Sequence, residues 1–286
     1  QFLNSRGGIE ADLTISRTGE EEFYIVTGSA FGVHDRSWIE KHSPRDGSVV
    51  IDDLTEEFGV INLCGPHARD VLQNVIDDDI SNETLPFSSY ADIRVAGHPV
   101  RAMRIGYVGE LGWEMHMGRE NMPAVYKALA EAGSQYDIAD VGYRAIDSLR
   151  MEKGYLYWSS DISPDYNPFE AGLGFRVNMK KGDFIGRDAL IAIRENGGPE
   201  RKIAYFTLEK YMPVYGSEPI MREGRILDVT TSANFGYTIG KPLVFGYLPV
   251  QEFENRNFTV EAFGEVVPAT RHDGPLYDPE MKKLKL

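Results

Sequence analysis

The sequence is poor in cysteine, in long apolar runs and in basic residues, and each shortage excludes a class of protein. Among its 286 residues there is one cysteine, Cys64, so no internal disulfide can form and a reducing compartment is expected. No run of about 18 apolar residues occurs, so no membrane-spanning helix is predicted. The formal net charge of −14 at pH 7 argues against general binding to nucleic acid or to anionic membranes, because both attract positively charged surfaces.

Several common catalytic and cofactor motifs are also missing. No Gly-x-Gly-x-x-Gly follows a strand-like run and no phosphate-binding loop occurs, so a site for a dinucleotide or ATP is not expected. The Gly-x-Ser-x-Gly motif of serine hydrolases is absent. The six histidines lack the spacing of metal ligands, and no metal site is predicted. Cys64 lies in an apolar run without a basic neighbour, which favours a buried structural thiol over a nucleophile.

What the sequence does contain is the composition of an ordinary folded protein, with 42% hydrophobic and 26% charged residues. A chain of this length is expected to form two or three domains. Its first residues, Gln-Phe-Leu-Asn, belong to an ordered-looking stretch and include no initiator methionine. We therefore expect a segment of a longer protein.

Strand-like and helical patterns divide the chain into three predicted domains. Residues 1–86 alternate strands with helical spacing, including expected strands at 48–52 and 60–64 and an amphipathic helix over 67–76. This alternation is typical of an α+β domain with an antiparallel sheet. The second predicted domain, 87–196, contains two strands and two helices, expected at 91–96, 99–106, 121–132 and 140–153.

The pattern changes beyond residue 200. Strand-like runs are separated there by glycine, proline and asparagine turns, without a long helical repeat. Residues 200–286 therefore predict a small all-β barrel or sandwich.

The stretch Arg6–Ser16 is the first candidate for a functional site. Gly7 and Gly8 allow a tight turn without a Cβ penalty. Apolar and polar residues then alternate, which predicts a strand with Asp12 and Thr14 on its polar face. A carboxylate would thus lie beside a turn whose small residues let another molecule approach. From the pattern alone, a polar strand face that meets only water remains the simpler alternative.

The stretch Gly106–His116 is the second candidate. Gly109 and Gly112 bracket a turn between two strand-like runs, so a hairpin is predicted. Tyr107 and Glu114 would flank the turn from opposite strands and face one site. An aromatic ring beside a carboxylate suits a flat heterocycle, because the ring stacks on it and the carboxylate accepts paired N–H bonds. From the spacing alone, an ordinary hairpin with a packed tyrosine and an exposed glutamate is the favoured interpretation.

The stretch 140–154 is the third candidate and predicts an amphipathic helix that ends at Gly154. Arg144 and Asp147 are three residues apart on this helix and can pair. Arg144, near the start of the helix, could reach a carboxylate ligand, whereas Arg150 is expected to make a structural ion pair. Charged helix faces are usually solvated, so this stretch by itself does not define a site.

Together these stretches resemble the folate-binding aminomethyltransferase family, typified by the glycine cleavage T-protein. Within that family the chain is most similar to the C-terminal folate domain of dimethylglycine and sarcosine dehydrogenases. The matching motifs occur in the family's order and cover essentially the whole chain, which makes their combination specific. They are Leu3-Asn4 with Gly7 to Asp12, Gly106 to Glu114, Arg144 to Lys153, Pro168 to Gly174, Lys181 to Gly186, and Pro275 to Pro279. Asp183 stands where the iron–sulfur-assembly branch carries a cysteine, which argues against that branch.

The resemblance implies a fold and a set of site residues. The implied fold is α+β, a cloverleaf of two ferredoxin-like α/β lobes, the first truncated, and a C-terminal all-β barrel. Asp12 would be the catalytic carboxylate near the reacting folate nitrogens, with Thr14 pointing the same way. Tyr107 and Glu114 would hold the pterin, and Arg144 would be a further folate contact.

The implied activity is transfer of a one-carbon unit from an N-methyl amine, such as dimethylglycine or sarcosine, to tetrahydrofolate, giving 5,10-methylene-tetrahydrofolate. An FAD-containing dehydrogenase domain or subunit would be the partner, with FAD bound outside this chain. Cytoplasm, or the mitochondrial matrix in a eukaryote, is the expected location. Two alternatives remain: a T-protein acting on an aminomethyl-lipoyl carrier, and a non-catalytic folate-binding module.

Overall fold

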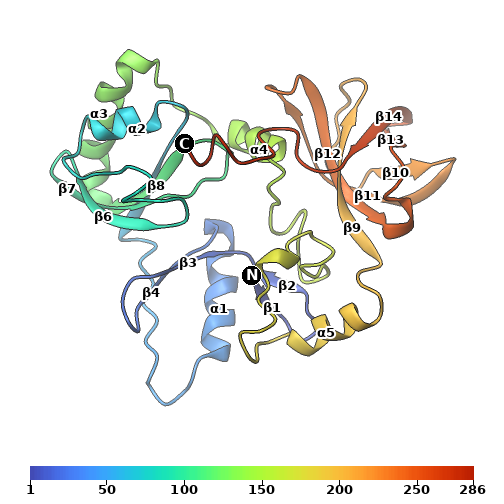
Figure 1. Ribbon diagram of the computed structural model, residues 1–286, viewed down its shortest axis with the longest axis horizontal. Helices are drawn as coiled ribbons and strands as arrows, with labels where there is room; N and C mark the ends of the chain where they lie inside the picture. The colour runs from blue at the N-terminus through green and yellow to red at the C-terminus, as the bar shows by residue number, and fades with distance from the viewer. The chain divides into compact units, whose positions relative to one another are not determined.

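A computed structural model describes all 286 residues of the chain, 1–286, and they form two compact units. The first unit combines Gln1–Leu13 with Asp147–Pro279, and the second combines Thr14–Ile146 with Glu280–Leu286. Each unit contains both helices and strands (Figure 1). None of the helices combines the length and the hydropathy that a membrane span requires.

A four-stranded antiparallel sheet is the centre of the second unit. The strand order is β5-β8-β7-β6, and β6 and β7 form a tight hairpin through Ala96 and Gly97, both at positive φ as a type I′ turn requires. Helices α2 and α3 lie against this sheet (Figure 1). The elements are β5 (Phe58–Cys64), α2 (Ala68–Gln73), β6 (Tyr90–Val95), β7 (His98–Met103), β8 (Gly112–Gly118), η2 (Arg119–Asn121), α3 (Met122–Gly133) and η3 (Ser134–Tyr136).

Alternation along β8 separates the two faces of this sheet. Trp113, Met115 and Met117 are buried in the core beneath α2 and α3. Successive side chains of a strand point to opposite faces, so Glu114 and His116 project from the other face. That second face is where the polar groups of the sheet gather.

A two-stranded ribbon and one helix complete the start of the second unit. β3 and β4 pair antiparallel, with Thr14 opposite Val26. The ribbon is exposed on one face, where the side chains of Ile15 and Phe23 meet solvent. The elements are β3 (Thr14–Arg17), β4 (Phe23–Val26), η1 (Ser29–Phe31) and α1 (Gly32–His42).

The last residues of the chain, Glu280–Leu286, pack in the second unit against two arginines. Leu284 is buried, and the fully buried Arg104 donates to the main-chain oxygens of Leu284 (3.2 Å) and Leu286 (2.7 Å). The Arg104 guanidinium also lies 4.9 Å from the centre of the Trp113 ring. Burial, assisted by the neighbouring Arg69, lowers the pKa of Arg104 to about 10, so this arginine is still charged at neutral pH. Carbonyl oxygens and an aromatic face therefore compensate a buried cation.

The first unit joins the N-terminal strands, a helical segment and a barrel. Strands β1 and β2 pair antiparallel, and helix α4 belongs to this unit from Asp147 onward. Its elements outside the barrel are β1 (Phe2–Leu3), β2 (Ile9–Ala11), α4 (Tyr143–Glu152), η4 (Gly174–Arg176) and α5 (Arg187–Glu195).

The six remaining strands close into a barrel in the order β10-β11-β12-β9-β14-β13. Closure leaves no unpaired strand edge. Apolar side chains fill the interior, where the rings of Phe206 and Phe258 pack edge to face with their centres 5.6 Å apart. The elements are β9 (Arg201–Leu208), β10 (Pro219–Arg222), β11 (Arg225–Gly236), β12 (Lys241–Pro249), η5 (Val250–Glu252), β13 (Asn257–Ala262) and β14 (Glu265–His272).

A buried ion pair ties α4 to the loop that follows it and to the barrel. Arg150 donates to Asp161 at 2.7 Å, and both side chains are almost fully buried. Thr231, on β11, donates to the other oxygen of Asp161 at 2.6 Å, and Tyr247, on β12, donates to the Asp161 carbonyl at 2.8 Å. Because every charge has partners, this network fixes one arrangement of helix, loop and barrel.

The predicted α+β class with a C-terminal β domain is confirmed, and that domain is a closed barrel. The predicted strand at 48–52 is wrong, because residues 43–57 contain neither strand nor helix. The strand predicted over 99–106 ends at Met103, and the helix predicted from 140 begins at Tyr143. The boundaries proposed for three domains, 1–86, 87–196 and 200–286, stay a prediction.

Replacing Arg150 by methionine should destabilise the fold strongly. The substitution R150M leaves the Asp161 carboxylate buried without its cation, and breaking such a pair costs about 3–5 kcal/mol in the free energy of unfolding. Urea unfolding followed by tryptophan fluorescence measures the loss. R144M, on the exposed face of the same helix, should change the stability by less than about 0.5 kcal/mol. Equal stabilities of the two variants would contradict the structural role given to Arg150.

Candidate functional site

The turn before Asp12 is built around the side chain of Asn4. Its oxygen accepts from the backbone N–H groups of Arg6 and Gly8, both at 3.0 Å. The backbone N–H of Asn4 donates to the Gly8 carbonyl at 2.9 Å, and Gly7 takes a positive φ of 83° between them. An asparagine amide closing a glycine turn is a local motif that needs no distant partner.

Gly8 and Ile9 fix this turn to the segment 158–166 of the same unit. A Cβ at Gly8 would lie 1.9 Å from the carbonyl oxygen of Pro164, so only glycine fits there. Ile9 donates its N–H to the Tyr166 carbonyl at 2.9 Å, and its own carbonyl accepts from the Trp158 ring N–H at 3.1 Å. Strand β2 is therefore held along its backbone up to the residue before Asp12.

Asp12 follows the last residue of β2 and is exposed. Its carboxylate accepts from the Gln1 side-chain amide at 3.0 Å. Asp12 is thus an exposed carboxylate directly after a strand whose Ile9 backbone is hydrogen-bonded to Tyr166 and Trp158.

Thr14 does not continue the strand of Asp12. The predicted strand over 11–16 is interrupted, because β2 ends at Ala11 and β3 begins at Thr14. The two strands have different partners, β1 for β2 and β4 for β3. Thr14 is half-buried in the second unit, whereas Asp12 belongs to the first.

Tyr107 and Glu114 both belong to the second unit. The predicted hairpin forms, but its connection is a loop of residues 104–111 rather than a tight turn at the glycines. Tyr107 is half-buried in this loop. Glu114 lies on β8 opposite Asn62 of β5 and Met103 of β7, and its side chain is 22% exposed.

His116 lies beside Glu114 on the same face of the sheet. Its ring is 2% exposed, and its Nε2 atom lies 3.6 Å from Oε2 of Glu114. Nδ1 of His116 is 3.2 Å from the hydroxyl of Tyr24, which comes from β4. A histidine between a phenol and a carboxylate makes this a connected polar cluster within one unit.

Arg101 packs against Tyr24 at the edge of this polar cluster. Its guanidinium lies 5.0 Å from the centre of the Tyr24 ring and binds the Asp92 carboxylate through two bonds, of 2.8 and 3.0 Å. The hydrogen bond to Asp92 raises the pKa of Arg101. Burial raises the pKa of Tyr24 despite the nearby Arg101 charge, so the phenol stays protonated and able to donate.

Arg144 lies in the first turn of α4 and is exposed. The ion pair of this helix is formed by Arg150, which donates to Asp147 at 2.8 Å, so the structural role predicted for Arg150 is confirmed. Asp147 therefore pairs with Arg150 rather than with Arg144.

Cys64 is exposed on β5, which corrects the prediction of a buried thiol. Although the residue meets solvent, partial desolvation of its sulfur raises the pKa of the thiol, and the Glu110 carboxylate raises it further. The expectation that Cys64 is a poor nucleophile therefore rests on charge and desolvation rather than on complete burial.

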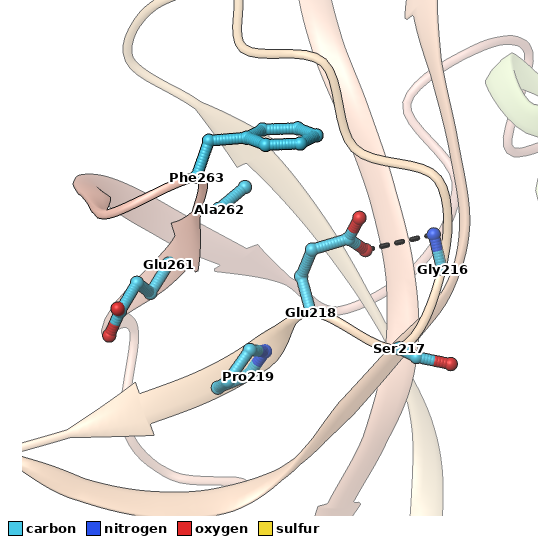
Figure 2. A pocket seen from close by; sticks show the side chains of 7 residues that line it. All are labelled: Gly216, Ser217, Glu218, Pro219, Glu261, Ala262 and Phe263. Carbon is cyan, nitrogen blue, oxygen red and sulfur yellow. Dashed lines mark hydrogen bonds between the residues drawn. The ribbon is translucent and has the colours of Figure 1, made fainter.

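A hollow of about 300 Å³ lies on the barrel and contains none of the predicted site residues. Figure 2 shows Glu218 in its wall, with the carboxylate turned to the N–H of Gly216. Thr230 and the N–H of Tyr215 also donate to this carboxylate, at 2.6 and 2.7 Å. Because its own loop already satisfies Glu218, this hollow offers no free charged group from that residue.

No cluster of three or more histidine, cysteine, aspartate or glutamate side chains could hold a metal ion.

The polar cluster includes three residues that were not predicted from the sequence: His116, Tyr24 and Arg101. Alternation along 113–117 was a usable signal, because it places His116 on the face of Glu114. The partner Tyr24 lies 92 residues earlier in the chain, so no local pattern connects the two.

Two family models match the chain. They are the GCVT N-terminal domain, over residues 1–181, and the glycine cleavage T-protein C-terminal barrel domain, over residues 201–278. Mitochondrial sarcosine dehydrogenase of Mus musculus is 38% identical over 307 residues, which cover 99% of this chain and 33% of that protein. Mitochondrial dimethylglycine dehydrogenase of Mus musculus is 38% identical over 288 residues, covering 100% of this chain and 33% of that protein.

The chain therefore spans about a third of the length of these two relatives. Among solved structures, the glycine cleavage system aminomethyltransferase T from Bartonella henselae matches with a TM-score of 0.82 at 25% identity. The match covers 97% of this chain and 74% of that one. This chain therefore shares the fold of that aminomethyltransferase over 97% of its length.

The turn before Asp12 makes a prediction about Gly8. In G8A the new methyl group would overlap the Pro164 carbonyl. A backbone carbonyl cannot move aside as easily as a side chain, so we expect a loss of about 3 kcal/mol in unfolding free energy. G32A is the matched control: Gly32 has a helical φ of −53°, and its added methyl meets nothing within 4 Å. Its stability should be unchanged or up to about 1 kcal/mol higher. Thermal unfolding of both variants measures the difference, and a stable G8A would contradict the close approach.

Proposed function

Because the chain belongs to the glycine cleavage T-protein family of folate-dependent aminomethyltransferases, we propose that it transfers a methylene unit from an N-methyl amine to tetrahydrofolate. The observation that carries the choice of donor is identity of 38% over essentially the whole chain with sarcosine and dimethylglycine dehydrogenases. Sarcosine or dimethylglycine is the proposed donor, and 5,10-methylene-tetrahydrofolate the product.

The proposed chemistry begins with an iminium ion, in which the former methyl carbon is doubly bonded to the amine nitrogen. One folate nitrogen attacks this carbon, and the second then displaces the amine, so that the carbon bridges both. The folate loses two protons, of which one goes to the departing amine and one to solvent. An iminium ion hydrolyses readily in water, so the folate must be held within attack distance before it arrives.

Asp12 is the proposed catalytic residue for this sequence. A carboxylate stabilises the positive charge that develops on the folate nitrogen and passes its proton to the leaving amine. The geometry that supports the assignment is an exposed carboxylate at the end of a strand whose backbone is held by Tyr166 and Trp158.

The pterin is assigned to Tyr107 and Glu114, with Thr14 and Arg144 as further folate contacts. Glu114 suits the 2-amino and N3–H groups of a pterin, because a carboxylate accepts two parallel N–H bonds as it does from a guanidinium. Its partial exposure on a face lined with polar groups supports this role. Arg144 is exposed and cationic, which suits a carboxylate of the folate tail.

A flavin-dependent dehydrogenase is the proposed partner, either as a further domain or as a separate subunit. The oxidation that forms the iminium ion needs an electron acceptor, and the sarcosine and dimethylglycine dehydrogenases to which the chain is similar are about three times its length. FAD would bind in that other part. The proposed location is the mitochondrial matrix in a eukaryote and the cytoplasm otherwise.

The second candidate is a T-protein that acts on an aminomethyl-lipoyl carrier, and the match to the Bartonella henselae aminomethyltransferase favours it. Mixing the chain with loaded carrier protein and tetrahydrofolate separates the candidates. Release of ammonia from the carrier, together with inactivity toward the N-methyl amine, would overturn our choice of donor.

Carbon-13 labelling tests the proposed reaction. With N-¹³CH₃-sarcosine, a sarcosine-oxidising flavoenzyme and tetrahydrofolate, the chain should move the label into 5,10-methylene-tetrahydrofolate, detected by NMR, in place of free formaldehyde. D12N should slow this transfer by about 100-fold or more, the usual contribution of acid–base catalysis. Its affinity for 5-formyltetrahydrofolate should stay close to that of the parent.

The matched control is D77N, which changes an exposed aspartate in a loop of the second unit. It should transfer the label at the parent rate. Full transfer by D12N would show that Asp12 is not catalytic, and label that appears only as formaldehyde with the parent chain would refute the folate reaction. A non-catalytic folate-binding module would bind 5-formyltetrahydrofolate without moving label.

A further inference from the structure

We propose that His116 is a positioning residue that holds the Glu114 carboxylate ready for the pterin, with Tyr24 fixing the proton on the histidine. This inference rests on the proposed assignment of Glu114 to the pterin. It concerns a group that does not touch the folate itself and acts through its neighbour.

The first observation is an unsatisfied nitrogen. The His116 ring is 2% exposed, and its Nε2 atom has no hydrogen-bond partner. A buried polar atom without a partner destabilises the fold, so a nearby acceptor is favoured to move into reach. Oε2 of Glu114 lies 3.6 Å away, just beyond hydrogen-bond distance. Because the Glu114 side chain is 22% exposed, a small rotation can close this gap.

The second observation decides which nitrogen carries the proton. Nδ1 of His116 is 3.2 Å from the Tyr24 hydroxyl, and a neutral imidazole has one donor and one acceptor nitrogen. If Nε2 were the nitrogen without a proton, its lone pair would face the negative carboxylate of Glu114. Donation from the Tyr24 hydroxyl to Nδ1 avoids this repulsion and leaves an N–H at Nε2 directed toward Glu114.

The third observation is that the ring cannot easily turn. The Tyr24 and His116 rings meet edge to face at 89°, with centres 5.5 Å apart. Tyr24 is itself covered by the Arg101 guanidinium, which Asp92 holds through two bonds, and the same guanidinium lies 5.2 Å from the Tyr90 ring. His116 is therefore oriented by a chain of contacts drawn from β4, β6 and β7.

The consequence is a carboxylate whose direction is set before the ligand arrives. Each carboxylate oxygen has two lone pairs, so Oε2 can accept from His116 and from a pterin N–H at the same time. Holding Glu114 in advance reduces the conformational entropy lost on binding, which is how preorganisation raises affinity. The role assigned to His116 is thus to increase folate affinity and selectivity for the 2-amino group.

Two substitutions of His116 separate its two nitrogens. Glutamine places an amide nitrogen near the position of Nε2, whereas asparagine reaches only the position of Nδ1. With 5-formyltetrahydrofolate as the probe and titration calorimetry as the method, H116N should raise Kd about tenfold, a loss equal to one moderate hydrogen bond. H116Q should raise it by less than about threefold, because its amide still reaches Glu114.

A double-mutant cycle with E114Q shows whether His116 acts through Glu114. E114Q alone should raise Kd, and adding H116N to E114Q should then change it by less than about twofold. A role in folding alone would not give this result. A folate analogue that lacks the 2-amino group provides a second readout: the parent chain should discriminate against it, and H116N should discriminate less.

Three results would contradict the positioning role of His116. If E114Q weakens binding and H116N weakens it equally in both backgrounds, His116 does not act through Glu114, and the positioning role alone is overturned. If H116N binds like the parent, the role is also overturned. If E114Q itself leaves Kd unchanged, the pterin assignment of the proposed function fails first and this inference with it. Should H116N not fold, Y24F in the same cycle tests the coupling, because it removes only the phenol hydroxyl.

Discussion

The ion pair between Arg150 and Asp161 is the constraint on which the first unit depends. It lies where helix α4, the loop after it and two barrel strands meet, and Thr231 and Tyr247 complete its hydrogen bonding. The same loop carries Trp158, whose ring N–H binds the carbonyl of Ile9 in the strand that ends before Asp12. The position of the proposed catalytic carboxylate therefore depends, through a few bonds, on a buried charge pair.

In the second unit, the corresponding constraint is the two-residue alternation of β8. Trp113, Met115 and Met117 bury themselves against two helices, and this burial fixes the register of the strand. Once the register is fixed, Glu114 and His116 must project from the opposite face, since a slip by one residue would expose the core. Hydrophobic packing on one side thus decides the chemistry available on the other.

The turn chemistry and the class of fold were predictable from local sequence. Asn4, Gly7 and Gly8 form their turn through their own backbone and one side chain, and the barrel follows from closely spaced strands and turns. The predictions from sequence were wrong where the structure of a segment depends on the strand with which it pairs. Residues 48–52 have strand-like composition but no strand to pair with, and the strand expected over 11–16 is divided because its halves pair with different neighbours. His116 was missed for a related reason, since its partner Tyr24 is distant in the chain.

The central claim is that a reduced pterin binds beside Tyr107 and Glu114, and hydrogen–deuterium exchange of the chain with and without 5-formyltetrahydrofolate measures it most directly. Few backbone hydrogen bonds hold the loop 104–111, so its amides should exchange quickly when free and more slowly when the ligand covers them. We predict that the ligand slows amide exchange in this loop. Exchange in the barrel hollow, at 216–219 and 261–263, should be the same with and without the ligand. Unchanged exchange in 104–111 at saturating ligand, or slowing confined to the barrel hollow, would contradict it.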